Sequence, residues 1–183
     1  TLASAHVLYE FGFYEPDEVI KFYTQSGTIT SSFKKGTIEL DMPLRLPIEI
    51  PADEKVDDLL GVKTRALAQY NNTLLLAELE NAEMVRSFAP DHDNIMQLDY
   101  VDLLITAPET EKYDFVSRFF SPKTGIFEDP VTGMAHCSLA PYWAAKTGKT
   151  EFFAHQASPR GGDVWVRVGT DRVYLGGKAV TVL

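Results

Sequence analysis

Two segments of this sequence are apolar almost all the way round a helix, and they constrain the fold more than any other feature. Residues 1–9 form the first and residues 132–147 the second, with Gly12 and Gly148 placed where helices commonly end. A helix that is apolar on every side must be enclosed by other elements. Runs with a strand-like pattern fill most of the remaining chain. We therefore predict an α/β protein (α+β type) of two similar halves, each a curved mixed sheet wrapped around a central apolar helix, with the helix N-termini facing a shared cleft.

Turn residues divide the rest of the chain into short elements. The pair Asn71-Asn72 separates two apolar runs, and because it tolerates positive φ it predicts a tight hairpin. A proline-rich stretch over residues 41–51 is the best linker candidate. The expected domains are residues 1–45, as the remainder of an N-terminal half, and residues 46–183, as the C-terminal half. Short helices are expected at residues 53–60, 81–88 and 91–98. Strands are expected at residues 19–24, 28–33, 37–40, 63–70, 73–80, 100–107, 113–121, 151–157, 164–168, 172–175 and 178–183. The last strand could return to the first half.

The charge balance and the cysteine content limit the possible partners. The chain has 17 basic and 26 acidic residues, a net charge of −9 and no basic cluster, so nucleic acid and anionic membrane surfaces are not expected partners. No apolar run approaches the roughly 20 residues of a membrane span. Cys137 is the only cysteine, which excludes an internal disulfide and a thiolate metal cluster and favours a cytoplasmic location.

The junction before the second apolar helix is the best candidate for chemistry. Asp129 precedes Pro130, which biases its backbone away from the helical region and can place its side chain at the rim of a strand-to-helix turn. Thr132 is a good N-cap, and small residues after it leave the first backbone N–H groups open to an anion. A carboxylate beside such an anion site suggests proton transfer on a bound acidic substrate. The alternative, in which Asp129 only caps the helix, is about equally supported by this stretch.

The residues assigned to this site are one catalytic carboxylate and a set of binding groups. Asp129 is the catalytic candidate, whereas Glu128 should point elsewhere, so that a second acid or base must come from another part of the chain. Arg160, presented by two glycines, is a candidate clamp for a substrate carboxylate, although a solvated turn arginine is the commoner case. The substrate-binding candidates are Thr132, Gly133, Met134, Ala135 and Arg160.

Other reactive residues of the second helix are better explained by structure. His136, in the first turn, is expected to be a neutral, hydrogen-bonded histidine, because the helix dipole disfavours a positive charge there. Cys137 is flanked by apolar residues and is expected to be an inert thiol. Pro141 removes the hydrogen bond to the Cys137 carbonyl and predicts a kink near that residue. No histidine has the spacing of a metal ligand, so no metal site is expected.

Motifs along nearly the whole chain resemble those of a known family. The segment Glu-Asp-Pro-x-Thr-Gly at residues 128–133 is the most specific of them. The others, in family order, are residues 1–8, 24–27, 114–120, 136–137, 139–143, 156–162 and 177–183. The sequence thus resembles the phenazine-biosynthesis-like (PhzF-like) isomerases, which have the diaminopimelate-epimerase-like fold. The resemblance implies two similar α/β halves around a cleft and a homodimer. It also implies that Asp129 is the active-site acid and that Gly133 and the amides after it hold the anion.

The resemblance also shows two departures. Met134 stands where family members usually have Ser, which removes or replaces a hydroxyl contact to the substrate. The catalytic Glu of the family and its Cys-Gly-His-Ala turn would precede Thr1. Because the chain begins directly in an apolar helix, we expect it to be the later part of a longer chain. The leading hypothesis is an isomerase that uses general acid/base proton transfer on a small carboxylated, anionic metabolite, without a metal or an organic cofactor. The alternative is a catalytically silent binding or scaffold protein that keeps the fold.

Overall fold

A computed structural model describes residues 1–24, 27–34 and 36–182. Within these residues one sheet of twelve strands has the order β1-β2-β3-β12-β11-β10-β8-β7-β6-β5-β4, with β9 paired to β8 outside this path. β6 with β7 and β10 with β8 are parallel pairs, and the other pairs are antiparallel. The strands are β1 (Ile20–Thr24), β2 (Gly27–Lys34), β3 (Thr37–Pro43), β4 (Ile48–Ile50), β5 (Ala66–Tyr70), β6 (Leu74–Glu78), β7 (Asp102–Pro108), β8 (Phe115–Ser121), β9 (Ile126–Asp129), β10 (Glu151–Gln156), β11 (Gly162–Val168) and β12 (Arg172–Gly177). The α/β fold class with a mixed sheet is confirmed.

The helices begin and end at the residues that local chemistry indicates. Asp53, Asn81 and Asp91 accept N-cap hydrogen bonds at 2.9–3.0 Å from the backbone N–H two or three residues later. Gly61 and Gly148 end their helices in the left-handed conformation. No helix in the described part of the chain combines the length and apolarity needed to cross a membrane. The helices are α1 (Leu2–Glu10), α2 (Glu54–Leu60), α3 (Ala82–Ser87), α4 (His92–Met96) and α5 (Gly133–Thr147), with a 3₁₀ turn, η1, at Pro122–Thr124.

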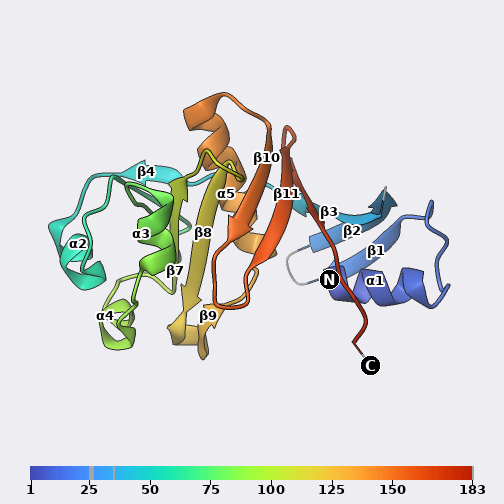
Figure 1. The fold of residues 1–183 in the computed structure, drawn as a ribbon, viewed down its shortest axis with the longest axis horizontal. Helices are drawn as coiled ribbons and strands as arrows, with labels where there is room; N and C mark the ends of the chain where they lie inside the picture. Colours follow the sequence, from blue (N-terminus) through green and yellow to red (C-terminus); the bar gives the residue numbers. More distant parts are fainter. Residues whose placement is uncertain (25–26, 35, 183) are drawn as a thin grey trace.

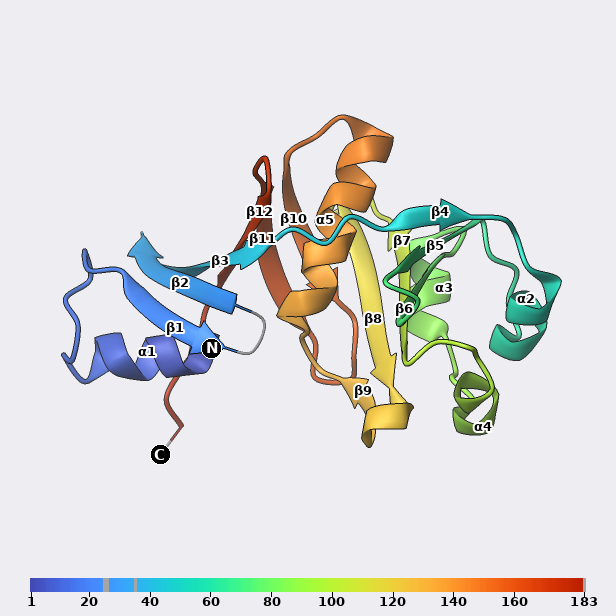
Figure 2. The ribbon, with the colours of Figure 1, turned by 180° about the vertical axis from the view of Figure 1, so that it is seen from behind.

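Helix α5 lies at the centre of the C-terminal part. Its residues from Ala135 to Trp143 are all buried, and they pack against inward-facing side chains of β6, β7, β8, β10, β11 and β12. Alternate residues of β6, such as Leu75, face the other side of the sheet, where α3 completes a second apolar cluster with α2 and α4. Figures 1 and 2 show α5 and α3 on opposite faces of the sheet. The enclosure expected for the second apolar helix is therefore confirmed.

Helix α1 has a different environment. It rests on β1, β2 and β3, where Ala5 packs with Ile20, Ile38 and Leu40. Ala5 is its only buried residue, and Val7 is 44% exposed. Enclosure of α1 on all sides was expected, yet among the described residues only one side is covered. The reason is that the apolar contacts of α1 come from β1, β2 and β3 at one end of the sheet, which lie along a single side of the helix.

The proline-rich stretch after β3 is more structured than a linker. It contains β4, and it crosses the face of α5 that lies away from the sheet, as Figure 2 shows. The backbone N–H of Arg45 donates to the Cys137 carbonyl oxygen at 3.1 Å. This is the carbonyl left without its helical partner by Pro141, so the crossing segment supplies the missing donor. The division into domains at residues 45 and 46 stays a prediction.

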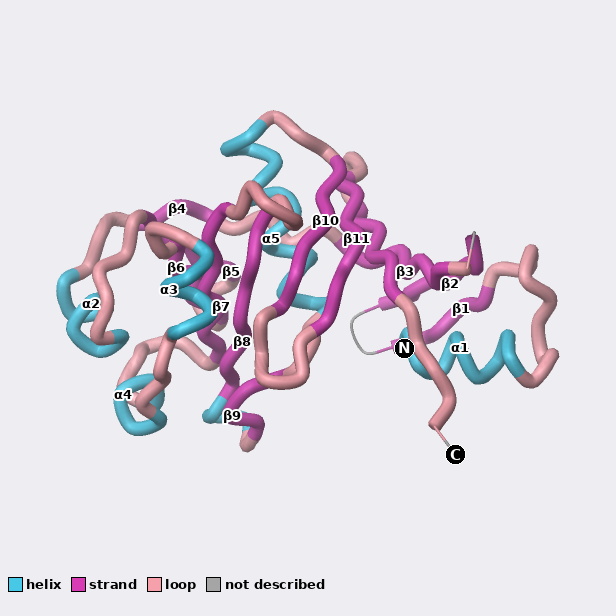
Figure 3. Tube along the Cα trace, in the orientation of Figure 1, coloured by secondary structure: helices cyan, strands magenta, loops and turns pink. Residues whose placement is uncertain are grey.

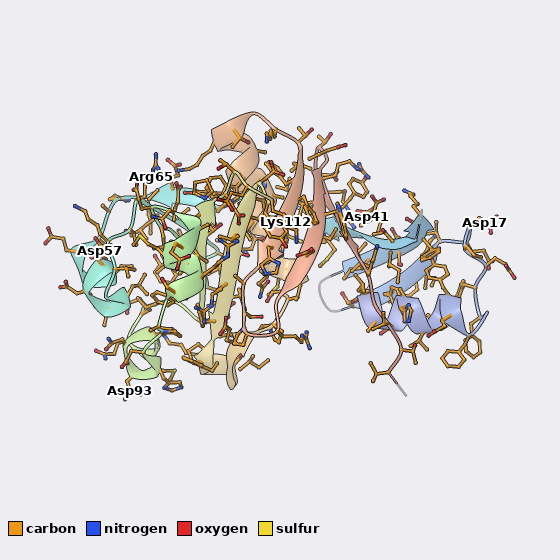
Figure 4. The ribbon with its side chains drawn as sticks, in the orientation of Figure 1. Asp17, Asp41, Asp57, Arg65, Asp93 and Lys112 are labelled. Atoms are coloured by element: carbon orange, nitrogen blue, oxygen red, sulfur yellow. The ribbon has the colours of Figure 1, made fainter. Side chains whose placement is uncertain are left out.

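The first and last parts of the chain meet where β3 pairs with β12. Asp41, labelled in Figure 4 at this junction, accepts a hydrogen bond from Arg172 Nε at 2.5 Å. β12 ends at Gly177, which is paired with Ile38, close to the start of β3. The prediction of a strand over residues 178–183 is therefore wrong for residues 178–182, because β3 offers almost no partner beyond that point, while residue 183 lies outside the described residues. Figure 3 shows this segment as a loop that runs past α1.

Candidate active site

Strand β9 positions the two carboxylates of the Glu-Asp-Pro turn in different environments. Glu128 and Asp129 pair with Phe120 and Phe119 of β8. The Glu128 carboxylate forms a two-point ion pair with Arg118, with N–O distances of 2.7 and 2.9 Å. Arg118 is itself buried and also donates to the Phe88 carbonyl at 2.6 Å. Glu128 is thus held away from the turn, as expected, and Asp129 is the carboxylate available at the start of α5.

Thr132 stands at the N-cap of α5 but does not cap it through its side chain. Its hydroxyl donates instead to Asp129 Oδ2. Across the described parts of the chain, Asp129 Oδ1 has no hydrogen-bond partner. The backbone N–H groups of the three residues after Thr132, which are Gly133, Met134 and Ala135, have none either. The predicted anion-binding amides therefore begin one turn of chain after a carboxylate that is held at one oxygen. Such a start of a helix favours a negative group at its amides.

A glutamine on β10 connects the members of this turn. Gln156 is fully buried and accepts a hydrogen bond from the Thr132 backbone N–H at 2.7 Å. Its side-chain nitrogen lies 2.6 Å from the Asp129 carbonyl oxygen and 3.2 Å from the Thr132 hydroxyl oxygen. Gln156 is not among the site residues predicted from the sequence. A signal was present, because Phe152, Ala154 and Gln156 alternate on the inward face of one strand, and a polar residue there requires buried partners.

The loop that carries Arg160 is fastened to the same turn. The Ser158 hydroxyl donates to the Pro130 carbonyl at 2.8 Å and accepts from the Gly161 amide at 3.0 Å. Gly162 packs so closely on Val131 that an added Cβ would lie 2.4 Å from a methyl group, so this position requires glycine. Arg160 is exposed on the loop that these contacts hold beside the Asp129 turn. The structure thus brings the loop of Arg160 to the other predicted site residues.

The first-turn histidine and cysteine have the properties of structural residues. His136 is fully buried, and its Nδ1 lies 2.8 Å from the Thr132 carbonyl oxygen. Burial lowers the pKa of His136 to about 4, so the ring is neutral at pH 7. Burial raises the pKa of Cys137 to about 12, which keeps its thiol protonated and unreactive. Neither residue therefore supplies a second acid or base at the Asp129 turn.

A groove of the surface lies away from the Asp129 turn. Its volume is about 510 Å³, and it is lined by residues of β3, β10, β11 and β12, among them Trp165 and Arg167. Trp165 and Arg167 alternate with Val164 and Val166 of the α5 cluster, so these two side chains are on the outer face of the sheet. The groove contains none of the predicted site residues. Among the described residues, no three His, Cys, Asp or Glu side chains converge as metal ligands would.

Comparisons with known proteins agree with this fold. A family model described as phenazine biosynthesis-like protein matches residues 1–183. An uncharacterized isomerase of Halalkalibacterium halodurans is 41% identical over 186 residues, which cover 100% of this chain and 69% of the relative. An uncharacterized isomerase of Pseudomonas aeruginosa is 40% identical over 182 residues and has the same coverage. A solved PhzF-family phenazine biosynthesis protein of Enterococcus faecalis is 36% identical with a TM-score of 0.89, over 97% of this chain and 67% of that one. The resemblance read from the sequence is confirmed, and the chain belongs to the phenazine biosynthesis-like (PhzF) family.

Proposed function

We propose that this chain is part of an isomerase that moves a proton on a small carboxylated metabolite by general acid/base catalysis. The observation that carries the proposal is the Asp129 carboxylate, which is held at Oδ2 by Thr132 in the turn that leads into α5, where the amides of the first three helical residues have no hydrogen-bond partner among the described residues. The family membership and the isomerase names of two relatives support the reaction class.

The proposed roles follow from the chemistry of each group. Asp129 takes or returns the proton through Oδ1, while the hydroxyl on Oδ2 fixes the orientation of the carboxylate. The amides of Gly133, Met134 and Ala135 bind an anionic group of the substrate. Arg160 binds a carboxylate through its planar guanidinium group.

Deuterium exchange tests this function with a panel of candidate substrates. The chain would be incubated in D₂O with small hydroxy, amino and unsaturated carboxylic acids, and the mass of each acid would be followed. We expect at least one acid to gain a deuterium on carbon, with a rate that falls about 10²- to 10⁴-fold in Asp129→Asn. Asp91→Asn, at the N-cap of α4, is the matched control and should exchange at the wild-type rate. An unchanged rate in Asp129→Asn would contradict the assigned role.

One observation favours the alternative of a catalytically silent binding protein. Among the described residues, the side chains hydrogen-bonded to the Asp129 side chain or its backbone carbonyl are those of Thr132 and Gln156, neither of which exchanges protons readily near pH 7. An isomerase of this kind commonly needs a second acid or base. An acid that raises the melting temperature of the chain but gains no deuterium would support this alternative.

The wider setting is proposed from the family resemblance and the composition. We propose a cytoplasmic homodimer that binds a small anionic metabolite and uses neither metal nor organic cofactor. The single cysteine supports a reducing compartment. Light scattering checks the oligomeric state: a mass near twice 20.4 kDa is expected for the 183-residue chain, and a mass near 20.4 kDa would contradict the dimer.

A further inference from the structure

The Gln156 side chain forms several hydrogen bonds to the Asp129 turn. It lies at the end of β10 with no exposed surface, and its amide group contacts the Thr132 N–H, the Asp129 carbonyl and the Thr132 hydroxyl. Three hydrogen bonds from one buried side chain to two residues of one turn fix the position of both residues.

The chemistry of the partners determines which atom of the Gln156 amide is which. The backbone N–H of Thr132 can only donate, so the atom 2.7 Å from it is the amide oxygen. The amide nitrogen is then the atom that faces the Asp129 carbonyl oxygen, an acceptor, and the Thr132 hydroxyl oxygen. The orientation of Gln156 is therefore set by two backbone groups that cannot change their roles.

This orientation determines in turn where the Thr132 hydroxyl hydrogen points. Because the hydroxyl oxygen accepts from the Gln156 N–H, its single hydrogen is free to donate to another group. That group is Asp129 Oδ2. One carboxylate oxygen is thus occupied by a donor, and Oδ1 is left without a partner among the described residues.

We propose that Gln156 is a positioning residue, which aligns the Thr132 hydroxyl with Asp129 Oδ2 and so presents Oδ1 as the oxygen that exchanges a proton with the substrate. The catalytic part of this inference rests on the function proposed above. The hydrogen-bond relay, which runs from Gln156 through the Thr132 hydroxyl to Asp129 Oδ2, is a property of the chain itself. Gln156 acts through Thr132 and Asp129 and does not contact the substrate.

A substitution of similar length separates this role from simple packing. Gln156→Met keeps the length of the side chain without adding a charge, but its thioether has no N–H to donate. The Thr132 hydroxyl is then no longer oriented by a donor, and its bond to Asp129 is no longer enforced. Thr132→Val, which removes the hydroxyl at nearly constant shape, gives the reference state without that bond. Ser117→Ala is the matched control, because Ser117 is the β8 neighbour of Gln156, is buried, and has a hydroxyl with no partner in the described structure.

The experiment is ¹³C NMR of the 183-residue chain with carbon-labelled aspartate carboxyl groups at pH 7, with no ligand added. Loss of a signal in Asp129→Asn assigns the Asp129 carboxyl carbon. We expect Gln156→Met to move this signal to its position in Thr132→Val, and Ser117→Ala to leave it at the wild-type position. Melting temperatures verify that each variant is folded, and if Gln156→Met fails to fold, Gln156→Leu removes the donor with a different side-chain shape.

The outcomes separate the relay from the proposed function. An Asp129 signal that stays at the wild-type position in folded Gln156→Met or Gln156→Leu would overturn the inference, because the hydroxyl would then be aligned without Gln156. The NMR result needs no substrate, so absent deuterium exchange in the wild type would contradict the proposed function and leave the relay intact. With an exchanging acid, the exchange rate at saturation should fall about 10- to 100-fold in Gln156→Met, while the concentration for half-saturation changes less than about twofold.

Discussion

Helices α1 and α5 are alike in sequence character and differ in what surrounds them. Both are apolar nearly all round, yet nine consecutive residues of α5 are buried, whereas Ala5 is the only buried residue of α1. α5 is enclosed by the sheet on one side and by the segment between β3 and β4 on the other. α1 has three strands beneath it. All-round apolarity therefore shows that a helix needs a cover, but it does not show that neighbouring residues of the chain supply one.

The largest effect is expected for a truncation inside α5. Leu139 is fully buried in the central apolar cluster, so Leu139→Ala removes apolar contacts and leaves a cavity. We expect the free energy of unfolding to fall by about 2–5 kcal/mol in urea titrations. A loss below about 1 kcal/mol would mean that α5 is not enclosed as described.

Helix α5 contains a fully buried histidine that should make stability depend on pH. The pKa of His136 is lowered from 6.5 to about 4 by burial, so between these values the unfolded chain binds a proton that the folded chain does not. The contribution of neutral His136 to the free energy of unfolding is therefore fully present above pH 6.5. It decreases as the pH falls toward 4, by on the order of 3 kcal/mol in total.

One substitution isolates this contribution from that of the carboxylates. His136→Gln should flatten the dependence of unfolding free energy on pH between 6.5 and 4, whatever its effect on stability at pH 7. Equal slopes in wild type and His136→Gln would contradict the burial of a neutral imidazole.

The segment between β3 and β4 is held on α5 by a backbone hydrogen bond that one substitution can remove. Arg45→Pro removes the N–H that donates to the Cys137 carbonyl, which Pro141 has already deprived of its helical donor. A buried carbonyl without a partner costs about 1–3 kcal/mol, and we expect a loss of that size by urea titration. Arg45→Ala keeps the N–H and controls for the side chain, which lies over Tyr70. An equal loss in both variants would assign the effect to the side chain instead.

Several local features that the sequence predicted correctly are set by neighbouring residues. Asn71 and Asn72 adopt φ of 52° and 55° in the expected hairpin, because their conformation depends on their own side chains. The Arg45 N–H meets Cys137, and Gln156 meets Thr132, only because distant segments converge. Residues 178–182 fail as a strand for the same reason, since strand formation requires a partner that β3 no longer offers. At the site, the motif predicted the Asp129 turn, while the relay that aligns it depends on a long-range contact.

The smallest effect is expected on the outer face of α1, and it tests the comparison most directly. Val7 is 44% exposed, and Ala has the higher helix propensity, so Val7→Ala should change the free energy of unfolding by no more than about 0.5 kcal/mol. Urea titrations beside Leu139→Ala would measure it. A loss above about 1.5 kcal/mol would show that this face is covered in solution. If that loss grows with protein concentration, the cover is a second copy of the chain, because only association depends on concentration.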